Sequence, residues 1–465
     1  MTTIQTEPTR QGTGLRQTFE ALRRTEFARL DEGGHVYLDY TGSGLYADCQ
    51  VQDHDSFLER HVLGNPHSEN PASQAATRIV EDARRKVLDF FHADPAEYTV
   101  IFTSNASAAL KLVGEAYPFR PGSRFVLLED NHNSVQGIRV YAEAKGAETT
   151  YLPLDAELRL AAGAEIPDAP SVPSLFAFPG QSNFSGVKHP LSLIRDARNK
   201  GYRTVLDAAA YAPTNRLNLS EVTPDFACVA FYKMFGLPTG LGALLARKEA
   251  LAELERPWFA GGTVEYVSVQ NHVHRLRTDA ESFEDGTPNF LGIAAMPRGL
   301  AFLSDVGMEN VTLHVAEMTE RVLDILDCAC LPDGTPAIEV YGPRSSEARG
   351  GTVAFNLRGP GGGVLPYGDV ERAASAVGIS LRGGCFCNPG AAERALSLPA
   401  AEALECFEDI PRGTFTLKKF ARCIGEENAV GALRVSVGIP TTHADLDRFQ
   451  EFLDDFCRTQ GEPAG

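Results

Sequence analysis

Two charged residues follow strand-like runs in a pattern that suits pyridoxal-phosphate chemistry. Asp207 ends the run Val205-Leu-Asp, and Lys233 comes just after the apolar run 226–231. In an open α/β sheet, ligands bind in the crevice outside the carboxyl ends of the strands. A lysine there can form a Schiff base with the cofactor, while an aspartate keeps the pyridine nitrogen protonated so that the ring acts as an electron sink. Taken alone, a surface lysine and a helix-capping aspartate are the simpler interpretation of the pair.

Two further motifs strengthen the cofactor interpretation. The stretch 103–112, Thr-Ser-Asn-Ala-Ser-Ala-Ala-Leu-Lys-Leu, follows a predicted strand and opens a helix with small and hydroxyl residues. Free backbone N–H groups and the helix dipole make such a start an anion site, although an ordinary serine-capped helix has the same sequence. The stretch 131–134, Asn-His-Asn-Ser, also follows a strand, and its His132 could stack on a flat ring and act as an acid or base. A single histidine is more often a packing residue.

A third motif carries thiols. Residues 381–390 read Leu-Arg-Gly-Gly-Cys-Phe-Cys-Asn-Pro-Gly, which places Cys385 and Cys387 on a glycine-rich loop beside Arg382. Exposure and a positive neighbour favour the reactive thiolate. One alternative is a zinc site completed by Cys328 and Cys330, although the spacing is not typical of structural zinc. A second alternative is ordinary buried cysteines, which such a loop disfavours.

Composition excludes several classes of function. The 465 residues include 43 basic and 61 acidic side chains, for a net charge of −18. This balance argues against nucleic-acid binding and against docking on an anionic membrane. Nine cysteines are too dilute for a disulfide scaffold, and their odd number indicates reduced thiols. Residues 1–30 lack the apolar run of a signal peptide, and no run is long enough to span a membrane. We therefore expect a soluble cytoplasmic protein without a metal.

The elements that must position these residues alternate along the chain. Helical patterns separate the strand-like runs 99–103, 124–128, 175–178, 203–206, 226–231 and 243–246, which predicts a mostly parallel sheet. A helix over 18–30 precedes them, and one long helix is predicted over 299–330. Strands at 353–357, 379–382 and 433–437 and a helix at 445–456 form a second unit. We expect an α/β fold with an N-terminal arm (1–34), a large cofactor-binding domain (35–300) and a smaller α+β domain (301–465), with the arm packing on the latter.

Together these motifs resemble the fold-type I pyridoxal-phosphate enzymes of the class V aminotransferase group, in particular the cysteine desulfurase branch. The similarity is greatest to the N-terminal, desulfurase-like domain of eukaryotic molybdenum cofactor sulfurases. It extends over about 35–457 and includes Tyr37-Leu-Asp, Gly64-Asn-Pro-His-Ser, Gln181-Ser-Asn-Phe-Ser-Gly, Phe231-Tyr-Lys, Phe283-Glu-Asp-Gly-Thr, the cysteine motif and Arg434-Val-Ser. The order of so many motifs makes the resemblance specific.

The resemblance implies a role for each matching residue. Lys233 is the Schiff-base lysine, Asp207 the partner of the pyridine nitrogen, and His132 the stacking residue. Ala106 and Ser107 contact the phosphate of pyridoxal 5'-phosphate, and Thr287 reaches the phosphate of a neighbouring subunit, which implies a homodimer. The remaining roles concern the substrate: Asn183 lies near the ring hydroxyl and the substrate carboxylate, Arg434 and Arg382 bind that carboxylate, and Cys387, with Cys385 as the fallback, is the nucleophile.

Departures from the family pattern limit what is implied. Many class V enzymes have Ser-x-His-Lys at the lysine, where this chain has Ala230-Phe-Tyr-Lys, so Tyr232 could replace lost phosphate donors. Ala210 stands where a glutamine or histidine is usual, and Gly383-Gly replaces the Thr-Gly of the sulfurases, whose extra cysteine is Ala392 here. We expect no room for a C-terminal molybdenum-cofactor domain after residue 465, which leaves the sulfur acceptor open.

The leading hypothesis is an L-cysteine desulfurase-like enzyme that forms a persulfide on Cys387 and passes the sulfur to a protein or a small molecule. A first alternative keeps the cofactor but changes the reaction to that of a carbon–sulfur lyase, a selenocysteine lyase, a transaminase or an epimerase. A second alternative is a non-catalytic cofactor-binding or sulfur-carrier protein. Retention of Lys233, Asp207 and Arg434 together argues against the second. The segment 391–431 is expected to be partly helical, as a lid or a docking surface for the acceptor.

Overall fold

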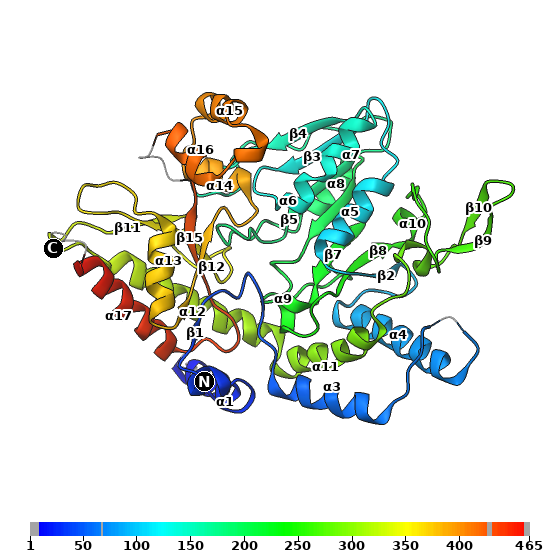
Figure 1. Ribbon diagram of the computed structural model, residues 1–465, viewed down its shortest axis with the longest axis horizontal. Coiled ribbons are helices and arrows are strands. Elements are labelled where there is room, and N and C mark those ends of the chain that lie inside the picture. The colour runs from blue at the N-terminus through cyan, green and yellow to red at the C-terminus, as the bar shows by residue number, and fades with distance from the viewer. Residues whose placement is uncertain (1–8, 67, 426–429, 460–465) are drawn as a thin grey trace, which may run out of the picture.

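The computed structural model describes residues 9–66, 68–425 and 430–459, and the architecture is α/β (Figure 1). A seven-stranded sheet with the order β2-β8-β7-β6-β5-β3-β4 forms the centre of the larger part. β3 to β7 run parallel, whereas β8 is antiparallel to both of its neighbours. The strands are β2 (Tyr98–Thr103), β3 (Arg124–Leu128), β4 (Glu148–Leu152), β5 (Leu175–Pro179), β6 (Arg203–Asp207), β7 (Phe226–Ala230) and β8 (Gly242–Arg247). The mostly parallel sheet predicted from the sequence is confirmed.

Helices cover both faces of this sheet, which explains why its central strands are continuous apolar runs. Every residue of β5 and of β7 is buried. Alternate side chains, such as Leu127 and Val126, enter two separate hydrophobic clusters on opposite faces. The helices of this part are α3 (Asp48–Arg60), α4 (Pro71–Phe90), α5 (Ala106–Ala116), α6 (Asn133–Gln136), α7 (Ile138–Ala144), α8 (Leu193–Asn199), α9 (Phe231–Phe235), α10 (Lys248–Leu251) and α11 (Phe290–Val306).

The second part is built on a four-stranded antiparallel sheet with the order β11-β12-β15-β14. Its strands are β11 (Ile338–Tyr341), β12 (Thr352–Leu357), β14 (Arg382–Gly384) and β15 (Ala432–Ser436). Beside it, β1 (Val36–Tyr37) pairs in parallel with β13 (Ile379–Ser380). Its helices are α12 (Met308–Cys328), α13 (Tyr367–Ala376), α14 (Pro389–Ala395), α15 (Ala400–Asp409), α16 (Leu417–Cys423) and α17 (His443–Thr459). The hairpin of β9 (Val264–Ser268) and β10 (Val273–Leu276) projects from the opposite side of the molecule (Figure 1).

The N-terminal segment packs on the second part. It forms α1 (Thr9–Glu26) and α2 (Arg29–Glu32). The ring of Phe19 stacks on His314 of α12 at 3.9 Å between centroids, and the buried Arg23 pairs with Asp445 of α17 at 3.1 Å. The segment that precedes β1 is thereby fixed against the C-terminal helix. The domain boundary at residue 300 stays a prediction.

Several predicted elements were wrong in extent. The single helix over 299–330 is two helices, because Gly307 adopts a φ of +84° between α11 and α12, a conformation that glycine tolerates. The helix over 18–30 is likewise two helices, and the strand over 379–382 divides into β13 and β14. The expectation of reduced thiols is wrong for Cys406 and Cys423, which form a disulfide because α15 and α16 pack side by side. In the described ranges, no helix is long and apolar enough to cross a membrane.

Candidate active site

One cavity of about 300 Å³ lies at the carboxyl ends of the central strands and collects most of the predicted cofactor residues. Its wall is contributed by the loops after β2, β3, β5, β6 and β7. The predicted residues that line it are Ala106, Ser107, His132, Asn183, Asp207, Tyr232 and Lys233. The topology therefore brings together residues that are 127 positions apart in the sequence, from Ala106 to Lys233.

Lys233 lies on the short helix α9, directly after β7. The backbone N–H of Gly44 donates to the carbonyl of Tyr232, and a Cβ on Gly44 would lie 2.7 Å from the Lys233 carbonyl oxygen. Glycine at position 44 is therefore required for this close approach. Burial lowers the pKa of Lys233, while the nearby Asp207 partly opposes the shift. A larger fraction of the amine is thus uncharged, as a nucleophile or a base requires.

Asp207 is buried at the end of β6, where the strand opens into the cavity. Its Oδ1 accepts a hydrogen bond from the backbone N–H of Ala209 at 3.0 Å. Asp207 raises the pKa of both Lys233 and His132 against the effect of burial, so its negative charge acts on both groups across the cavity. A buried carboxylate at this place is suited to a protonated ring nitrogen.

The start of α5 forms the wall of the cavity that was predicted to bind an anion, and it has the features of such a site. The Asn105 side chain caps the helix by accepting from the N–H of Ala108 at 2.9 Å. The N–H groups of the first helical turn have no acceptor within the helix, and those of Ala106 and Ser107 belong to residues that line the cavity. A Cβ on Gly242 of β8 would lie 2.6 Å from the Asn105 backbone, so this glycine lets strand and loop approach closely.

His132 caps α6 and is held in one tautomer. Its Nδ1 accepts the backbone N–H of Ser134 at 3.1 Å, so in the neutral ring the proton lies on Nε2. The Ser134 hydroxyl lies 3.0 Å from Nδ1 and 2.5 Å from the hydroxyl of Ser107, which links the histidine to the start of α5. Burial lowers the pKa of His132, opposed by Asp207. A neutral imidazole therefore lines the cavity at neutral pH.

Backbone contacts fix the loop that carries Cys387 to the cavity wall. The N–H of Asn133 donates to the Cys387 carbonyl at 2.7 Å, and the Asn183 side chain donates to the Phe386 carbonyl at 2.6 Å. Phe386 and Cys387 both have a φ of +55°, a conformation that residues other than glycine rarely adopt. The exposed Cys387 side chain does not line the cavity, but its loop is hydrogen-bonded to Asn183, which does, and to Asn133, which directly follows the cavity residue His132.

The fully buried Asn388 completes this attachment. Its side-chain nitrogen donates to the carbonyl of Asp130 at 2.7 Å and to Oδ1 of Asn183 at 3.0 Å, and its oxygen caps α14. The side chains of Phe386 and Asn388 are thus buried, whereas that of Cys387 between them is exposed. Nothing in the sequence pattern distinguishes Asn388 from an ordinary turn residue.

Cys385 has a different environment from Cys387. Its thiol donates to the carbonyl of Val430 at 3.1 Å, and burial raises its pKa. Of the two candidate nucleophiles, Cys385 is the less accessible. For the zinc alternative, the described residues contain no group of three or more potential metal ligands.

The two predicted carboxylate-binding arginines lie outside the cavity wall and already have a partner. Arg434 is buried and donates to the Asn183 carbonyl and to Oδ1 of Asp39, both at 3.0 Å. Arg382 donates to both oxygens of Asp39, and its Nε lies 3.0 and 2.9 Å from them. Asp39 had no predicted role. Asp39 lies 343 positions from Arg382, so local spacing carries no signal of the contact.

Thr287 does not line the main cavity. It is exposed and lines a separate cavity of about 250 Å³, which shares Ser104 and Gly240 with the main cavity. A contact of Thr287 with the phosphate of a neighbouring subunit stays a prediction.

The residues around the main cavity fit pyridoxal phosphate. A lysine with a lowered pKa, a buried carboxylate, a neutral imidazole and an open helix start match the aldehyde, ring nitrogen, ring face and phosphate of this cofactor. The cavity volume of about 300 Å³ lies at the lower end for small-molecule sites.

Comparison with known proteins gives the same family over most of the chain. The Aminotransferase class-V family profile matches residues 36–449. The molybdenum cofactor sulfurase of Arabidopsis thaliana is 35% identical over 94% of this chain and 58% of its own length. The human molybdenum cofactor sulfurase is 37% identical over 93% of this chain and 51% of its own length. The chain thus spans about half the length of the curated relatives it matches.

Solved structures share the fold. The apo cysteine desulfurase of Thermococcus onnurineus NA1 has a TM-score of 0.72 at 25% identity and covers 94% of this chain and 98% of its own. The cystine C-S lyase C-DES, in complex with its reaction product cysteine persulfide, has a TM-score of 0.67 at 16% identity and covers 90% of this chain and 97% of its own. The second likeness shows the fold alone. The chain belongs to the class-V aminotransferase family, whose members are pyridoxal-phosphate-dependent enzymes.

Proposed function

We propose that the protein is an L-cysteine desulfurase-like enzyme that converts L-cysteine to L-alanine and takes the sulfur as a persulfide on Cys387. The observation that supports this proposal most strongly is the attachment of the Cys387 loop to the cofactor cavity. The hydrogen bonds of Asn133 and Asn183 to this loop join the only exposed thiol of the motif to the elements that carry His132 and the cavity wall.

Each part of the cofactor has a residue to hold it. Lys233 would bind the aldehyde, Asp207 the ring nitrogen, and His132 the face of the ring. The first N–H groups of α5, the Ser107 hydroxyl and the Tyr232 phenol would bind the phosphate. Burial raises the pKa of Tyr232, so its hydroxyl stays protonated and can donate. When bound, pyridoxal phosphate supplies a conjugated ring that accepts the electron pair left at the substrate Cα.

The protein's own groups move the protons and the sulfur. The uncharged Lys233 Nζ takes the proton from the substrate Cα as a general base. The Cys387 Sγ then forms a bond to the substrate sulfur while the substrate Cβ–S bond breaks. Lys233 Nζ returns its proton to Cβ, and a proton equivalent to the one that the Cys387 thiol released goes back to Cα, so that cysteine becomes alanine and Cys387 becomes a persulfide that keeps the hydrogen of the substrate thiol. A protein thiol or a small molecule would then take up the outer sulfur.

Product analysis tests this proposal directly. Purified holoenzyme is incubated with L-cysteine, and alanine, pyruvate and ammonia are quantified together with the mass of the Cys387 peptide. We expect alanine in a 1:1 ratio with sulfur transferred and an increase of one sulfur atom on that peptide. Cys387→Ser should abolish alanine formation. Cys385→Ser and the control Cys328→Ser, at an exposed position on α12, should retain it.

The lyase alternative predicts other products. β-Elimination yields pyruvate and ammonia and needs no protein nucleophile. Undiminished pyruvate formation in Cys387→Ser would contradict the desulfurase proposal. Faster turnover of selenocysteine than of cysteine would shift the assignment to a selenocysteine lyase. If the visible absorption band that borohydride reduces is lost while the protein keeps its function, a non-catalytic role is favoured.

The quaternary structure and location are part of the proposal. A homodimer in the cytoplasm would place the exposed Thr287 near the phosphate of the partner subunit's cofactor. Sedimentation velocity should give a dimer, and Thr287→Val should weaken cofactor retention in the dimer. A fully active monomer would contradict this arrangement.

A further inference from the structure

Two arginines lie directly opposite each other in the small sheet. Arg382 of β14 and Arg434 of β15 are register partners on antiparallel strands. Like charges in this position destabilise a strand pair. Arg434 is also almost completely buried, with 3% of its side chain exposed, so solvent screens its charge poorly. Such a pair requires an anion between its members.

Asp39 supplies that anion from a distant part of the chain. The backbone of Leu38 bonds to Ser380 on one side and to Ser436 on the other, at 3.1 and 2.8 Å. The residue after Leu38 is therefore held between β15, which carries Arg434, and β13, which ends two residues before Arg382. Oδ1 of Asp39 accepts from Arg434 and Arg382, both at 3.0 Å, so one carboxylate joins both guanidinium groups.

A glycine leaves the space for this cluster. A Cβ on Gly42 would lie 2.6 Å from Oδ2 of Asp39 and 2.8 Å from Nη2 of Arg382. The backbone N–H of Gly42 donates to the Asp39 carbonyl, which closes the turn around the carboxylate. Chain geometry on both sides of Asp39 thus favours one position of its side chain.

The cluster is not neutral. Two guanidinium groups and the Asp39 carboxylate leave one positive charge within the cluster, while Glu371 acts on Arg382 from outside it. Arg434 retains an unused donor, because its buried Nε has no hydrogen-bond partner among the described residues. Arg382 is accessible from outside, with 49% of its side chain exposed. A ligand carboxylate could therefore reach the cluster at the exposed Arg382, where the remaining positive charge would compensate its own charge.

We propose that Asp39 is a positioning residue that aligns Arg382 and Arg434 and restricts the site to substrates with a single carboxylate. The inference deepens the proposed function and rests on it for the identity of the ligand, the α-carboxylate of an amino acid with a neutral side chain. Once the first carboxylate of a substrate has bound, a second acidic group finds no remaining positive charge, because the Asp39 carboxylate already compensates one of the two guanidinium groups. Without the charge of Asp39, the cluster would carry two positive charges and accept a dicarboxylate.

Binding of propionate and succinate to the holoenzyme tests the proposal. Both probes lack an amino group and a thiol, so titration calorimetry reports on the arginine cluster without turnover. Asp39→Asn keeps the shape of the side chain and should raise the affinity for succinate relative to propionate about tenfold, which is ~1.4 kcal/mol. The control Asp31→Asn removes a carboxylate that also pairs with an arginine, Arg23, and should leave the ratio unchanged.

A double variant separates charge from shape. Asp39→Asn combined with Arg382→Gln returns the cluster to one positive charge, so the ratio of affinities should return to within twofold of the wild-type value. A ratio in Asp39→Asn within twofold of wild type overturns the proposal. If circular dichroism shows that Asp39→Asn does not fold, Arg382→Gln alone should lower the ratio about tenfold, and an unchanged ratio overturns the proposal equally.

The outcome is separable from that of the proposed function. If the holoenzyme forms no alanine from L-cysteine but the affinity ratio shifts as expected, only the desulfurase proposal fails. If alanine forms and the ratio does not shift, only the role of Asp39 fails.

Discussion

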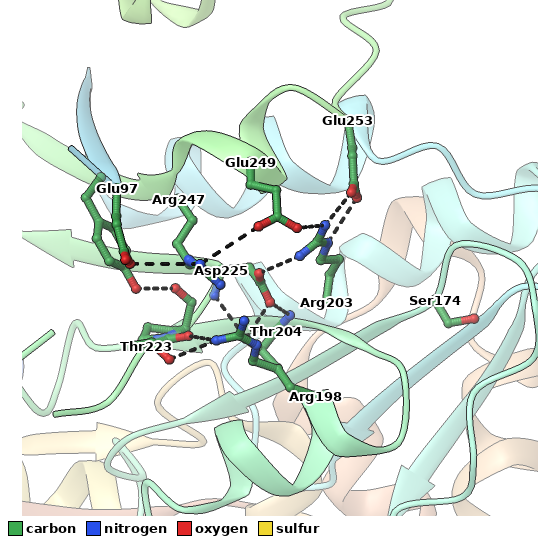
Figure 2. A network of polar contacts seen from close by, with 12 residues as sticks. Glu97, Ser174, Arg198, Arg203, Thr204, Thr223, Asp225, Arg247, Glu249 and Glu253 are labelled. Atoms are coloured by element: carbon green, nitrogen blue, oxygen red, sulfur yellow. Dashed lines mark hydrogen bonds and ion pairs between the residues drawn. The ribbon is translucent and has the colours of Figure 1, made fainter. Parts of the chain in front are cut away.

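The two ends of the central sheet use charged residues in opposite ways. β6 begins at Arg203 and ends at Asp207, and β7 follows Asp225 and leads into Lys233. At the amino end, Arg203 contacts the carboxylates of Asp225, Glu249 and Glu253 (Figure 2). At the carboxyl end, Asp207 and Lys233 line an open cavity. The same strands thus carry a closed ionic network at one end and the candidate active site at the other.

The two ends differ in the partners that surround their charged groups and in the resulting pKa shifts. The fully buried Asp225 accepts from Arg203 at 3.1 Å and from the N–H and hydroxyl of Thr204 at 2.8 and 2.9 Å. Hydrogen bonding to Glu253 is the main effect that raises the pKa of Arg203. At the other end, burial lowers the pKa of Lys233. The amino end therefore stabilises the fold, whereas burial at the carboxyl end shifts the Lys233 amine toward its uncharged form, as the proposed chemistry requires.

The largest effect that separates the two ends is expected from Lys233→Ala. Removal of the amine removes both the covalent anchor of the cofactor and the base, so alanine formation should fall by at least about 10⁴-fold. The free energy of unfolding of the cofactor-free protein should not decrease, because the variant removes a group that burial disfavours. Turnover assays and urea unfolding measure the two quantities. Turnover within tenfold of wild type would contradict the assignment of Lys233.

At the amino end, Asp225→Ala should have the reverse profile. It leaves Arg203 without its buried partner and Thr204 without its acceptor, which should cost about 3 kcal/mol of unfolding free energy. The turnover number of the folded fraction should stay within twofold of wild type, because Asp225 lies at the far end of β7 from Lys233.

A matched variant controls for loss of charge at the same network. Glu249→Gln changes an exposed member, for which we expect less than about 0.5 kcal/mol. A large effect on turnover with an unchanged urea midpoint in Asp225→Ala would break the distinction between the two ends.

Sequence reasoning located the residues that follow strands and missed those that reach across the fold. Asp207, His132 and Lys233 were predicted because each comes directly after an apolar run, and parallel strands bring such positions to one edge. The bounds of β3 were also predicted from its apolar run. These features depend on which residues are neighbours along the chain, and this can be read directly from the sequence.

The features that could not be predicted depend mostly on contacts between residues far apart in the sequence. Asp39 between its arginines, Asn388 at the Asp130 carbonyl and the Cys406–Cys423 disulfide each depend on tertiary packing. The helix break at Gly307 had a local signal, the glycine itself, but the apolar pattern continues across it. The paired state of Arg434 could not be read from its position in a strand.

A smaller effect is expected from Asn388→Ala, in the loop between β14 and α14 that carries Cys387. The variant removes the donor to the Asp130 carbonyl and to Asn183, which should cost about 1–3 kcal/mol of unfolding free energy. The positive φ values of Phe386 and Cys387 would lose a support, so persulfide formation should slow about tenfold, which is ~1.4 kcal/mol. Cofactor absorbance should be retained. The persulfide rate is followed by mass spectrometry after rapid acid quench, and an unchanged rate would contradict an anchoring role.

The smallest expected effect is a pH dependence of stability that the buried His314 and the half-buried His132 share, although only His132 is expected to couple to activity. Burial lowers the pKa of His314, at the interface of α1 and α12, to about 4, and it also lowers the pKa of His132. In both cases the unfolded chain binds the proton first as the pH falls below 6.5. The unfolding free energy of the cofactor-free protein should therefore fall below this pH and level off below the folded pKa, near 4 for His314. His314→Asn should flatten the lower part of this curve without moving the pH profile of turnover, whereas His132→Asn should change both. Identical turnover profiles for the two variants would show that His132 belongs with the structural groups and not with the reactive end of the sheet.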